Sequence, residues 1–259
     1  MLTSEMIRFE EELHQRLSAA TARLNQQLKW RENLLATLVH DMRTPLQALA
    51  GGLQLIEMAG DKLDAAKQAR ILEGARRGAN NLNEMIQLIL DSNRLDEGEL
   101  VLEWQAIEPQ PWLDDIVQAL HPLTEAMELT LESQIHPAVP LIWGDGSLLR
   151  RVIQNLVGNA VKFTPRGGKI SIIIAPSLQA DRVEIRVRDT GTGMRPEVLP
   201  QIFDRYYQSN KDDHKGYGLG LYFCRLAVEA HAGVIQAASQ VGSGTTISVV
   251  LPNEPKLNF

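Results

Sequence analysis

The stretch LLATLVHDMRTPLQALAGGLQLIEMAG, residues 34–60, decides the first part of the fold. Its apolar residues recur at steps of three and four, which predicts an amphipathic helix with one narrow apolar stripe. The stripe contains Leu35, Leu38, Met42, Leu46, Leu49, Leu53 and Ile56, and similar spacing extends back to Met6. A stripe this narrow and long is typical of a coiled-coil seam, so we expect one long helix over residues 1–58.

A second helix is predicted beyond Gly60-Asp61, where the pattern breaks. Between Leu63 and Asn93, apolar and small residues again recur at steps of four and three: Ile71, Ala75, Gly78, Leu82, Met85 and Ile89. Two helices joined by a short turn form an antiparallel hairpin. A hairpin with one apolar stripe per helix cannot bury itself well alone. We therefore predict a homodimer, in which two hairpins form a four-helix bundle.

The pattern changes from Trp112 onward, where helices alternate with short apolar strands. We predict helices over 112–127, 147–163 and 218–232, with strands near 129–135, 139–143, 169–175, 182–189, 234–239 and 245–251. This order predicts an α/β sandwich of about 150 residues. The fold class is α plus α/β, with a coiled-coil helix over 1–30, the hairpin over 31–97, a linker over 98–110, the sandwich over 111–253 and a tail over 254–259.

The bulk composition excludes several classes of partner. Of the 259 residues, 44% are hydrophobic, which is enough apolar material for one or two cores. The net charge of −6 gives no basic footprint, so we expect neither nucleic-acid binding nor membrane contact within this chain. No uncharged stretch approaches the roughly 20 residues needed to span a bilayer. The single cysteine, Cys224, suits a reducing cytoplasm. We expect a cytoplasmic location, either free or tethered through a sensor region outside this sequence.

His40 is the candidate nucleophile. At about 100° per residue it points away from the apolar stripe, with Asp41 beside it and Thr44 one turn further on. A neutral imidazole is a nucleophile, and a neighbouring carboxylate can take its proton or orient the ring. A lone histidine on a polar helix face is usually just solvated. Pro45, however, costs about 3 kcal/mol inside a helix, which favours a functional role for this segment. The other histidines are interpreted as surface or packing residues: His14, His121, His136, His214 and His231.

Asn155, Asn159 and Lys162 share one helix face. Amide oxygens can ligate Mg²⁺, and a lysine can contact phosphate oxygens. An ordinary polar helix face would show the same spacing, so this signal is weak alone.

Two glycine-rich segments strengthen the nucleotide interpretation. Asp189 ends a strand and precedes Gly191 and Gly193; its carboxylate can accept a hydrogen bond from an exocyclic amine while the glycines let backbone approach a flat ring. Taken alone, a simple glycine turn explains this segment equally well. The segment GYGLGL, residues 216–221, opens a helix and so offers free N–H groups and the helix dipole to an anion. It fits neither a Walker A sequence nor a Rossmann fingerprint.

In order, these segments resemble those of the sensor histidine kinases of bacterial two-component systems. HDMRTPL is similar to the phosphoacceptor box, RRVIQNLVGNAVKFT to the asparagine box, and DTGTGM and GYGLGLYFCRLAVEAHAG to the two glycine boxes. IFDRYYQ resembles the phenylalanine box and GSGTTISVVLP the closing segment. The resemblance covers about residues 30–252.

The resemblance implies an enzyme that uses ATP and Mg²⁺ to phosphorylate its own His40 and passes the phosphate to an aspartate of a response regulator. The same enzyme could also act as the regulator's phosphatase. It implies that Asp41 assists as base, that Thr44 positions water, and that Asn159 and Asn155 hold the metal. Phe203 and Arg205 would sit by the nucleotide lid. The full implied ATP-binding set is Asn155, Asn159, Lys162, Asp189, Gly191, Gly193, Phe203, Arg205, Gly216, Gly218, Leu219, Gly220 and Thr245.

Two alternatives remain at this point. A hydrolytic ATPase of the gyrase, Hsp90 or mismatch-repair type has the same nucleotide fold but carries a glutamate where this chain has Asn155, and an amide cannot be a general base. A non-catalytic coiled-coil scaffold would be expected to lack the acceptor, the metal ligand or the adenine carboxylate, and all three are present.

Overall fold

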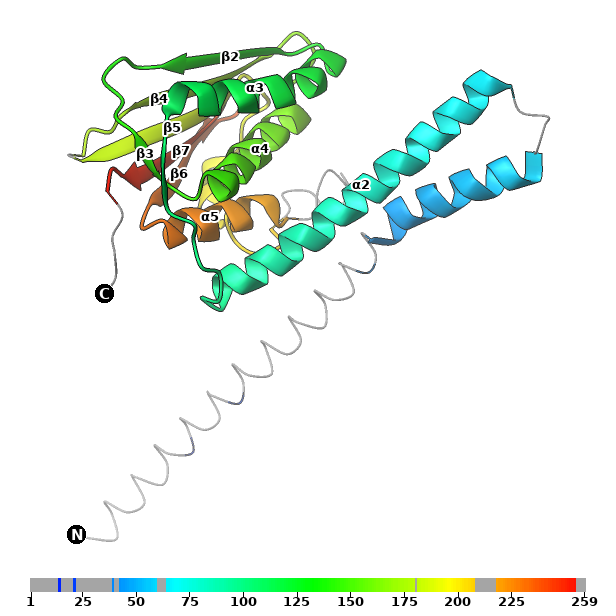
Figure 1. Ribbon diagram of the computed structural model, residues 1–259, viewed down its shortest axis with the longest axis horizontal. Helices are drawn as coiled ribbons and strands as arrows, with labels where there is room; N and C mark the ends of the chain where they lie inside the picture. The colour runs from blue at the N-terminus through cyan, green and yellow to red at the C-terminus, as the bar shows by residue number, and fades with distance from the viewer. Residues whose placement is uncertain are drawn as a thin grey trace. The chain divides into compact units, whose positions relative to one another are not determined.

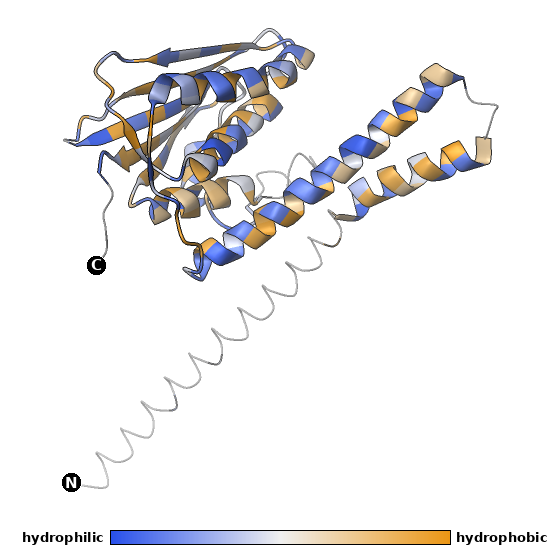
Figure 2. Cartoon of the chain, viewed as in Figure 1, coloured by the Kyte–Doolittle hydropathy of each residue, from blue (hydrophilic) through white to orange (hydrophobic). Residues whose placement is uncertain are grey.

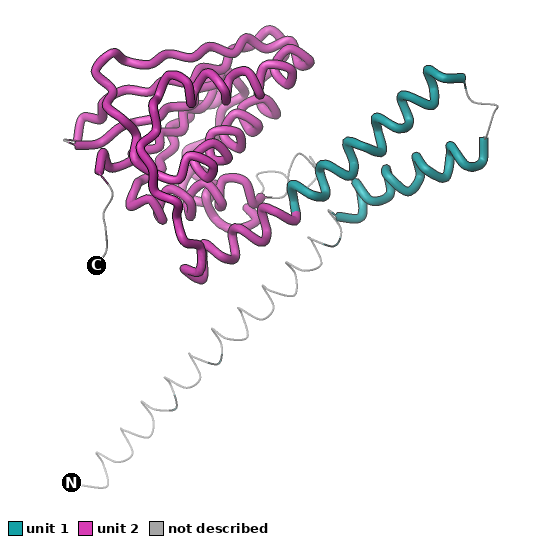
Figure 3. The backbone as a smooth tube through the Cα atoms, in the orientation of Figure 1, with its two compact units in different colours: residues 1–85 teal, residues 86–259 magenta. Residues whose placement is uncertain are grey.

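The structure, a computed structural model, describes residues 14, 21, 39, 42–59, 64–179, 181–207 and 218–254. The chain divides into two compact units, Met1–Met85 and Ile86–Phe259 (Figure 3). Most of the predicted coiled coil therefore lies outside the described residues, as do His40 and Asp41. No helix in the described part of the chain is long and apolar enough to cross a membrane.

The first unit contains the predicted helical hairpin. Residues 42–59 are helical, and α2 begins at Ala65 and ends at Asp96, three residues later than predicted. Both helices carry alternating apolar and polar bands (Figure 2). The predicted stripe of α2 provides the most buried side chains of this unit, because Ala75 is 7% exposed and Met85 is fully buried.

Glycines allow the two helices of the hairpin to approach closely. A Cβ atom at Gly78 would lie 2.7 Å from the carbonyl oxygen of Pro45. A Cβ atom at Gly52 would lie 3.3 Å from Cγ2 of Ile71. Since the earlier residue of one helix faces the later residue of the other, the helices run antiparallel, as the sequence predicts.

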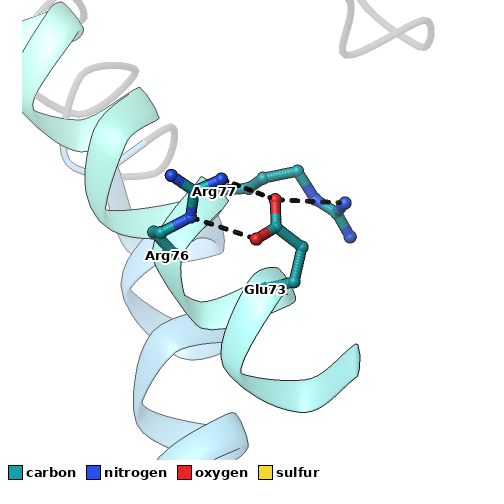
Figure 4. A network of polar contacts seen from close by, with 3 residues as sticks. All are labelled: Glu73, Arg76 and Arg77. Carbon is teal, nitrogen blue, oxygen red and sulfur yellow. Dashed lines mark hydrogen bonds and ion pairs between the residues drawn. The ribbon is translucent and has the colours of Figure 1, made fainter. Parts of the chain in front are cut away.

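The outer face of α2 carries exposed ion pairs at helical spacing (Figure 4). Glu73 accepts hydrogen bonds from Nε and Nη2 of Arg76, each at 3.0 Å, and lies 3.9 Å from Nη1 of Arg77. The hydrogen bond from Arg76 is the main cause that lowers the pKa of Glu73. Ion pairs this exposed add little to stability. Their exposure marks this side of α2 as its solvent face.

The second unit is built on a five-stranded sheet with the order β2-β4-β5-β7-β6. β2 pairs with β4 in parallel, and the other pairs are antiparallel. Three helices lie together on one side of the sheet (Figure 1). The sheet strands are β2 Thr130–Ile135, β4 Lys169–Pro176, β5 Arg182–Asp189, β6 Val234–Gln240 and β7 Gly244–Pro252; the helices are α3 Pro109–Ala126, α4 Gly146–Phe163 and α5 Gly220–Ala230.

These elements agree with the predicted ones to within a few residues. The predicted strand near 139–143 is observed as β3, Ile142–Gly144, which pairs antiparallel with the short strand β1, Gln105–Ile107. The 3₁₀ helix η2, Pro196–Gln201, completes the unit.

The core lies between the sheet and the three helices. Every second residue of β4 and β5 is buried there, as expected for strands covered on one face. Helix α4 inserts Val152, Ile153, Leu156 and Val157, all at most 2% exposed. Cys224 on α5 is fully buried, and burial raises the pKa of its thiol above the usual range. It is therefore the inert packing residue that the sequence indicates.

His231 fastens the start of α4 to the end of α5. Its Nε2 accepts a hydrogen bond from the backbone N–H of Asp145 at 2.9 Å, and its Nδ1 lies 2.7 Å from the carbonyl oxygen of Ala227. Asp145 in turn caps α4 by accepting from the N–H groups of Ser147 and Leu148. The imidazole is thus neutral, protonated on Nδ1 and accepting on Nε2. Burial lowers the pKa of His231.

The lowered pKa of His231 predicts a pH dependence of folding. The unfolded chain takes up this proton near pH 6.5, the folded chain only at lower pH. The contribution is therefore fully present above about pH 6.5 and is lost as the pH falls below it. In His231→Gln we expect a free energy of unfolding lower by about 1–3 kcal/mol at pH 8. Urea titrations should show this deficit shrinking between pH 6.5 and 5. A deficit independent of pH would contradict this account, and the exposed-site control His121→Gln should keep the native profile.

Candidate nucleotide-binding site

Asp189 organises the first part of the site. It stands at the end of β5, is 8% exposed, and its Oδ1 accepts hydrogen bonds from the N–H groups of Gly191 at 2.8 Å and Thr245 at 3.1 Å. Burial raises the pKa of the carboxyl, and the two backbone hydrogen bonds oppose this rise. No described residue donates to Oδ2, which is therefore available to a donor on a ligand.

Three glycines are required by the backbone packing around this carboxylate. A Cβ atom at Gly244, where φ is +91°, would lie 2.0 Å from the carbonyl oxygen of Asp189. A Cβ atom at Gly193, where φ is +66°, would lie 1.9 Å from that of Gln240, and one at Gly191 would lie 2.5 Å from that of Phe163. The loop after β5 is thus pressed against the turn between β6 and β7 on one side and the end of α4 on the other.

Ser239, which is not among the predicted site residues, holds this loop against the β6–β7 turn. Its Oγ accepts from the N–H of Met194 at 2.8 Å, donates to the carbonyl oxygen of Gly244 at 2.9 Å and lies 2.9 Å from Oγ1 of Thr245. Ser239 pairs with Thr245 across the two strands. The only sequence signal was the short turn at residues 241–243, which forces this pairing once both strands are known.

The second part of the site lies where α4 meets the start of α5. Nδ2 of Asn155 donates to the carbonyl oxygen of Arg151 at 2.9 Å, which directs Oδ1 away from its own helix. A Cβ atom at Gly220 would lie 3.0 Å from Oδ1 of Asn155 and 3.8 Å from Nδ2 of Asn159. Both predicted asparagines therefore face the first residue of α5, and a Cβ atom there would require the Asn155 amide to move by a few tenths of an ångström.

The loop before α5 is fixed by its backbone. The carbonyl oxygen of Gly218 accepts from the N–H of Tyr206 at 2.8 Å, and Gly218 has φ +65° with no room for a Cβ atom. Leu219, the N-cap residue of α5, makes no side-chain hydrogen bond to the helix, so among the described residues the first N–H groups of α5 are open to an anion. Leu219 is fully buried, so it can contribute to a ligand site only through its backbone.

Helix α4 joins the two parts. Its last residue, Phe163, accepts a hydrogen bond from the N–H of Thr192 in the loop after β5. Since Asn159 precedes Phe163 by one turn, the two parts lie about 6 Å apart along the helix. Lys162, exposed in the last turn, lies between them. The structure thus gathers Asp189, Gly191, Gly193 and Thr245 at one end and Asn155, Asn159, Gly218 and Gly220 at the other.

The remaining predicted residues do not join these two groups. Phe203 is half-buried against the core, and the Arg205 guanidinium contacts α2. Thr44 is exposed in the helical segment of the first unit. Gly216, His40 and Asp41 lie outside the described residues.

Two family models match this chain. Residues 30–98 match the His Kinase A (phospho-acceptor) domain. Residues 144–255 match the histidine kinase-, DNA gyrase B- and HSP90-like ATPase family. The chain is the core of a two-component sensor histidine kinase.

Individual relatives support the same family assignment. The adaptive-response sensory kinase SasA of Synechococcus sp. (strain JA-3-3Ab) is 33% identical over 254 residues, which are 96% of this chain and 66% of that protein. Full-length ShkA in complex with AMPPNP is 26% identical with a TM-score of 0.64, covering 85% of this chain and 45% of that one. ThkA in complex with the response regulator protein TrrA shares the fold at 18% identity, with a TM-score of 0.63 over 90% of this chain and 65% of that one. The chain spans about two thirds, 64% and 66%, of the first curated relatives it matches.

Two glycines of one turn provide a matched test of the site. Gly242 and Gly244 both have positive φ, yet a Cβ atom at Gly242 meets nothing within 4 Å while one at Gly244 would collide with Asp189. We expect Gly242→Ala to cost about 1–2 kcal/mol of stability with unchanged ADP affinity. Gly244→Ala should weaken ADP binding about ten- to a hundred-fold, because it displaces the carboxylate. Calorimetric titration with ADP measures the affinity of each variant. Equal affinities in the two variants would contradict the assignment of Asp189 to the nucleotide site.

Proposed function

We propose that this kinase core autophosphorylates His40 with ATP and passes the phosphoryl group to an aspartate of a response regulator. The observation that carries the proposal is Asn155. It occupies the position at which hydrolytic ATPases of this fold carry a glutamate, and its Oδ1 faces the start of α5. An amide cannot take a proton from water, so the site holds and orients a nucleotide without activating water for its hydrolysis. The phosphoacceptor domain on the same chain supplies a different nucleophile.

In this proposal the base of ATP binds at Asp189. Oδ2 accepts from the exocyclic amine of adenine while Gly191 and Gly193 let the backbone approach the ring. The phosphates bind at the N-terminus of α5, where the N-cap residue Leu219 provides no side-chain cap for the first N–H groups. Lys162 approaches the phosphates from α4.

The residues present fit a magnesium ion held jointly with phosphate. Mg²⁺ prefers oxygen ligands and is usually held through one or two protein groups plus substrate phosphates. Asn155 offers its amide oxygen at the start of α5, oriented by the hydrogen bond from its Nδ2 to Arg151, and the amide of Asn159 lies beside the same residue, Gly220. Within the described residues no group of three or more His, Cys, Asp or Glu side chains could hold a metal without phosphate. The ion supplies neutralisation of phosphate charge.

In this proposal His40, within the matched phospho-acceptor domain, attacks the γ-phosphorus as a neutral imidazole, the bond from that phosphorus to the β–γ bridging oxygen breaks, and ADP leaves. Asp41 accepts or orients the imidazole proton. Thr44 is exposed one turn further along. In this proposal it positions the water that removes phosphate from the response regulator, which would give the core a phosphatase activity. Such chemistry depends mainly on positioning and electrostatic stabilisation.

A second copy of the chain completes the hairpin in this proposal. Several apolar side chains of the first unit remain about half-exposed or more: Leu46 at 52%, Leu53 at 50%, Leu55 at 56%, Met58 at 79% and Leu72 at 47%. Leu46 and Leu53 belong to the predicted stripe. Association of two hairpins into a four-helix bundle would bury these residues, as expected for a homodimer. In this proposal the core acts in the cytoplasm, together with its response-regulator partner.

Incubation with γ-labelled ATP and Mg²⁺ tests the kinase proposal. The native chain should acquire acid-labile label, and His40→Gln should acquire none while still binding ADP. Asp189→Asn should label only at about ten- to a hundred-fold higher ATP, because an amide donor replaces the Oδ2 acceptor. Steady release of phosphate without label on the native chain would refute the kinase and favour a hydrolytic ATPase. Absence of both label and release would favour a scaffold.

A further inference from the structure

The last part of α2 belongs to the same compact unit as the sandwich. Two of its side chains hold Arg205, the second residue after Phe203. Oδ1 of Asn93 accepts from Nη2 of Arg205 at 2.5 Å, and Oδ2 of Asp96 lies 3.7 Å from Nη1. The Arg205 side chain is only 22% exposed, so most of its contacts are with the protein. Arg205 is thus fixed by residues more than a hundred positions earlier in the chain.

A short path leads from Arg205 to the proposed phosphate site. The next residue, Tyr206, donates its backbone N–H to the carbonyl oxygen of Gly218 at 2.8 Å, and a Cβ atom at Gly218 would lie 2.6 Å from the Tyr206 backbone. Two residues later, Gly220 faces Asn155. Movement of the Arg205 backbone would therefore be passed to the loop that opens α5.

The ring of Tyr222, in the first turn of α5, also contacts the Arg205 guanidinium. The guanidinium carbon of Arg205 lies 5.5 Å from the Tyr222 ring centroid and 5.3 Å from that of Tyr206. Burial, followed by the charge and the hydrogen-bonding of Asp96, raises the pKa of the Tyr222 hydroxyl. We call Asn93, Asp96, Arg205 and Tyr222 the Arg205 cluster. Through Arg205 the cluster contacts Tyr206, whose backbone is bonded to Gly218, and it includes Tyr222, two residues after Gly220.

We propose that Arg205 is a positioning residue: its attachment to Asn93 and Asp96 sets the geometry of the loop 218–220, so that binding of nucleotide phosphates depends on where α2 ends. The inference rests on the proposed function, because it assumes that this loop receives phosphate. Arg205 itself does not touch the nucleotide in this scheme. Its effect should be confined to the phosphate side, since the contacts of Asp189 involve none of these residues.

A neighbouring ion pair on the same helix provides the matched control. Asp91 accepts from Nη1 of Arg151, whose guanidinium carbon lies 4.8 Å from the ring centroid of Phe223. Like the Arg205 cluster, this pair joins α2 to the sandwich, but it makes no contact with Tyr206 or Gly218 within the described part of the chain. Asp91→Asn should lower stability without selective loss of phosphate binding.

Calorimetric titration of the full chain with AMPPNP and with AMP, in the presence of Mg²⁺, tests the proposal. Arg205→Ala and Asp96→Ala should each weaken AMPPNP binding by roughly two- to thirty-fold, with a smaller change for AMP. Arg205→Lys should restore part of the loss, since an ammonium keeps the charge but not the two-pronged geometry. The double variant Arg205→Ala/Asp96→Ala should bind no worse than Arg205→Ala, because both substitutions remove one interaction.

Three results would overturn the inference: unchanged AMPPNP affinity in Arg205→Ala, equal weakening of AMP and AMPPNP, or an equal effect of Asp91→Asn. Asp96→Ala keeps the proposal testable if Arg205→Ala fails to fold, because the Asp96 side chain is 46% exposed. Failure of the native chain to bind any adenine nucleotide would instead refute the proposed function.

Discussion

The orientation of α4 is the constraint on which the rest of the sandwich depends. Four of its side chains, from Val152 to Val157, are at most 2% exposed in the core. Rotation of the helix by even a quarter turn would expose them and bring Asn155 and Asn159 into apolar surroundings, where unpaired amides are costly. The burial of one face therefore fixes the asparagines on the other.

Both ends of α4 are held by groups from elsewhere in the chain. At the start, the N–H of Asp145 donates to His231, and the Asp145 side chain caps the helix. At the end, Phe163 accepts a hydrogen bond from the N–H of Thr192. The loop bearing Gly191 and Gly193 thus adopts a position set by α4, and Asp189 is held between this loop and Thr245. A site built on a rigid helix in this way needs little rearrangement to receive a ligand.

Much of this arrangement could be read from the sequence because it is local. The 3.6-residue period placed α4 within one residue of its observed start, and the glycine spacings placed Asp189 at the end of its strand and the start of α5 within two residues. Strand β1 has three residues, too few for a period to show. Ser239 could not be predicted because its hydrogen-bond partners depend on which strands pair. The last turn of α2 was missed because residues 94–96 are mostly polar, and the arginine that Asp96 contacts, Arg205, lies far along the chain.

The polar character of the Arg205 cluster also bears on how firmly α2 is held. An apolar contact of the same size would stabilise the attachment of α2 without needing paired hydrogen bonds. Buried polar groups, in contrast, cost free energy wherever a hydrogen-bond partner is lacking. Among the described residues, Nε of Arg205, Nε of Arg225 and Oγ of Ser92 are buried without a hydrogen-bond partner. The contact is therefore only partly satisfied, and water could replace its hydrogen bonds at small net cost. A contact of this kind can hold the loop 218–220 in one geometry and still be released. A nucleotide site needs such a releasable contact if the geometry of its phosphate-binding loop is to change with the position of the end of α2.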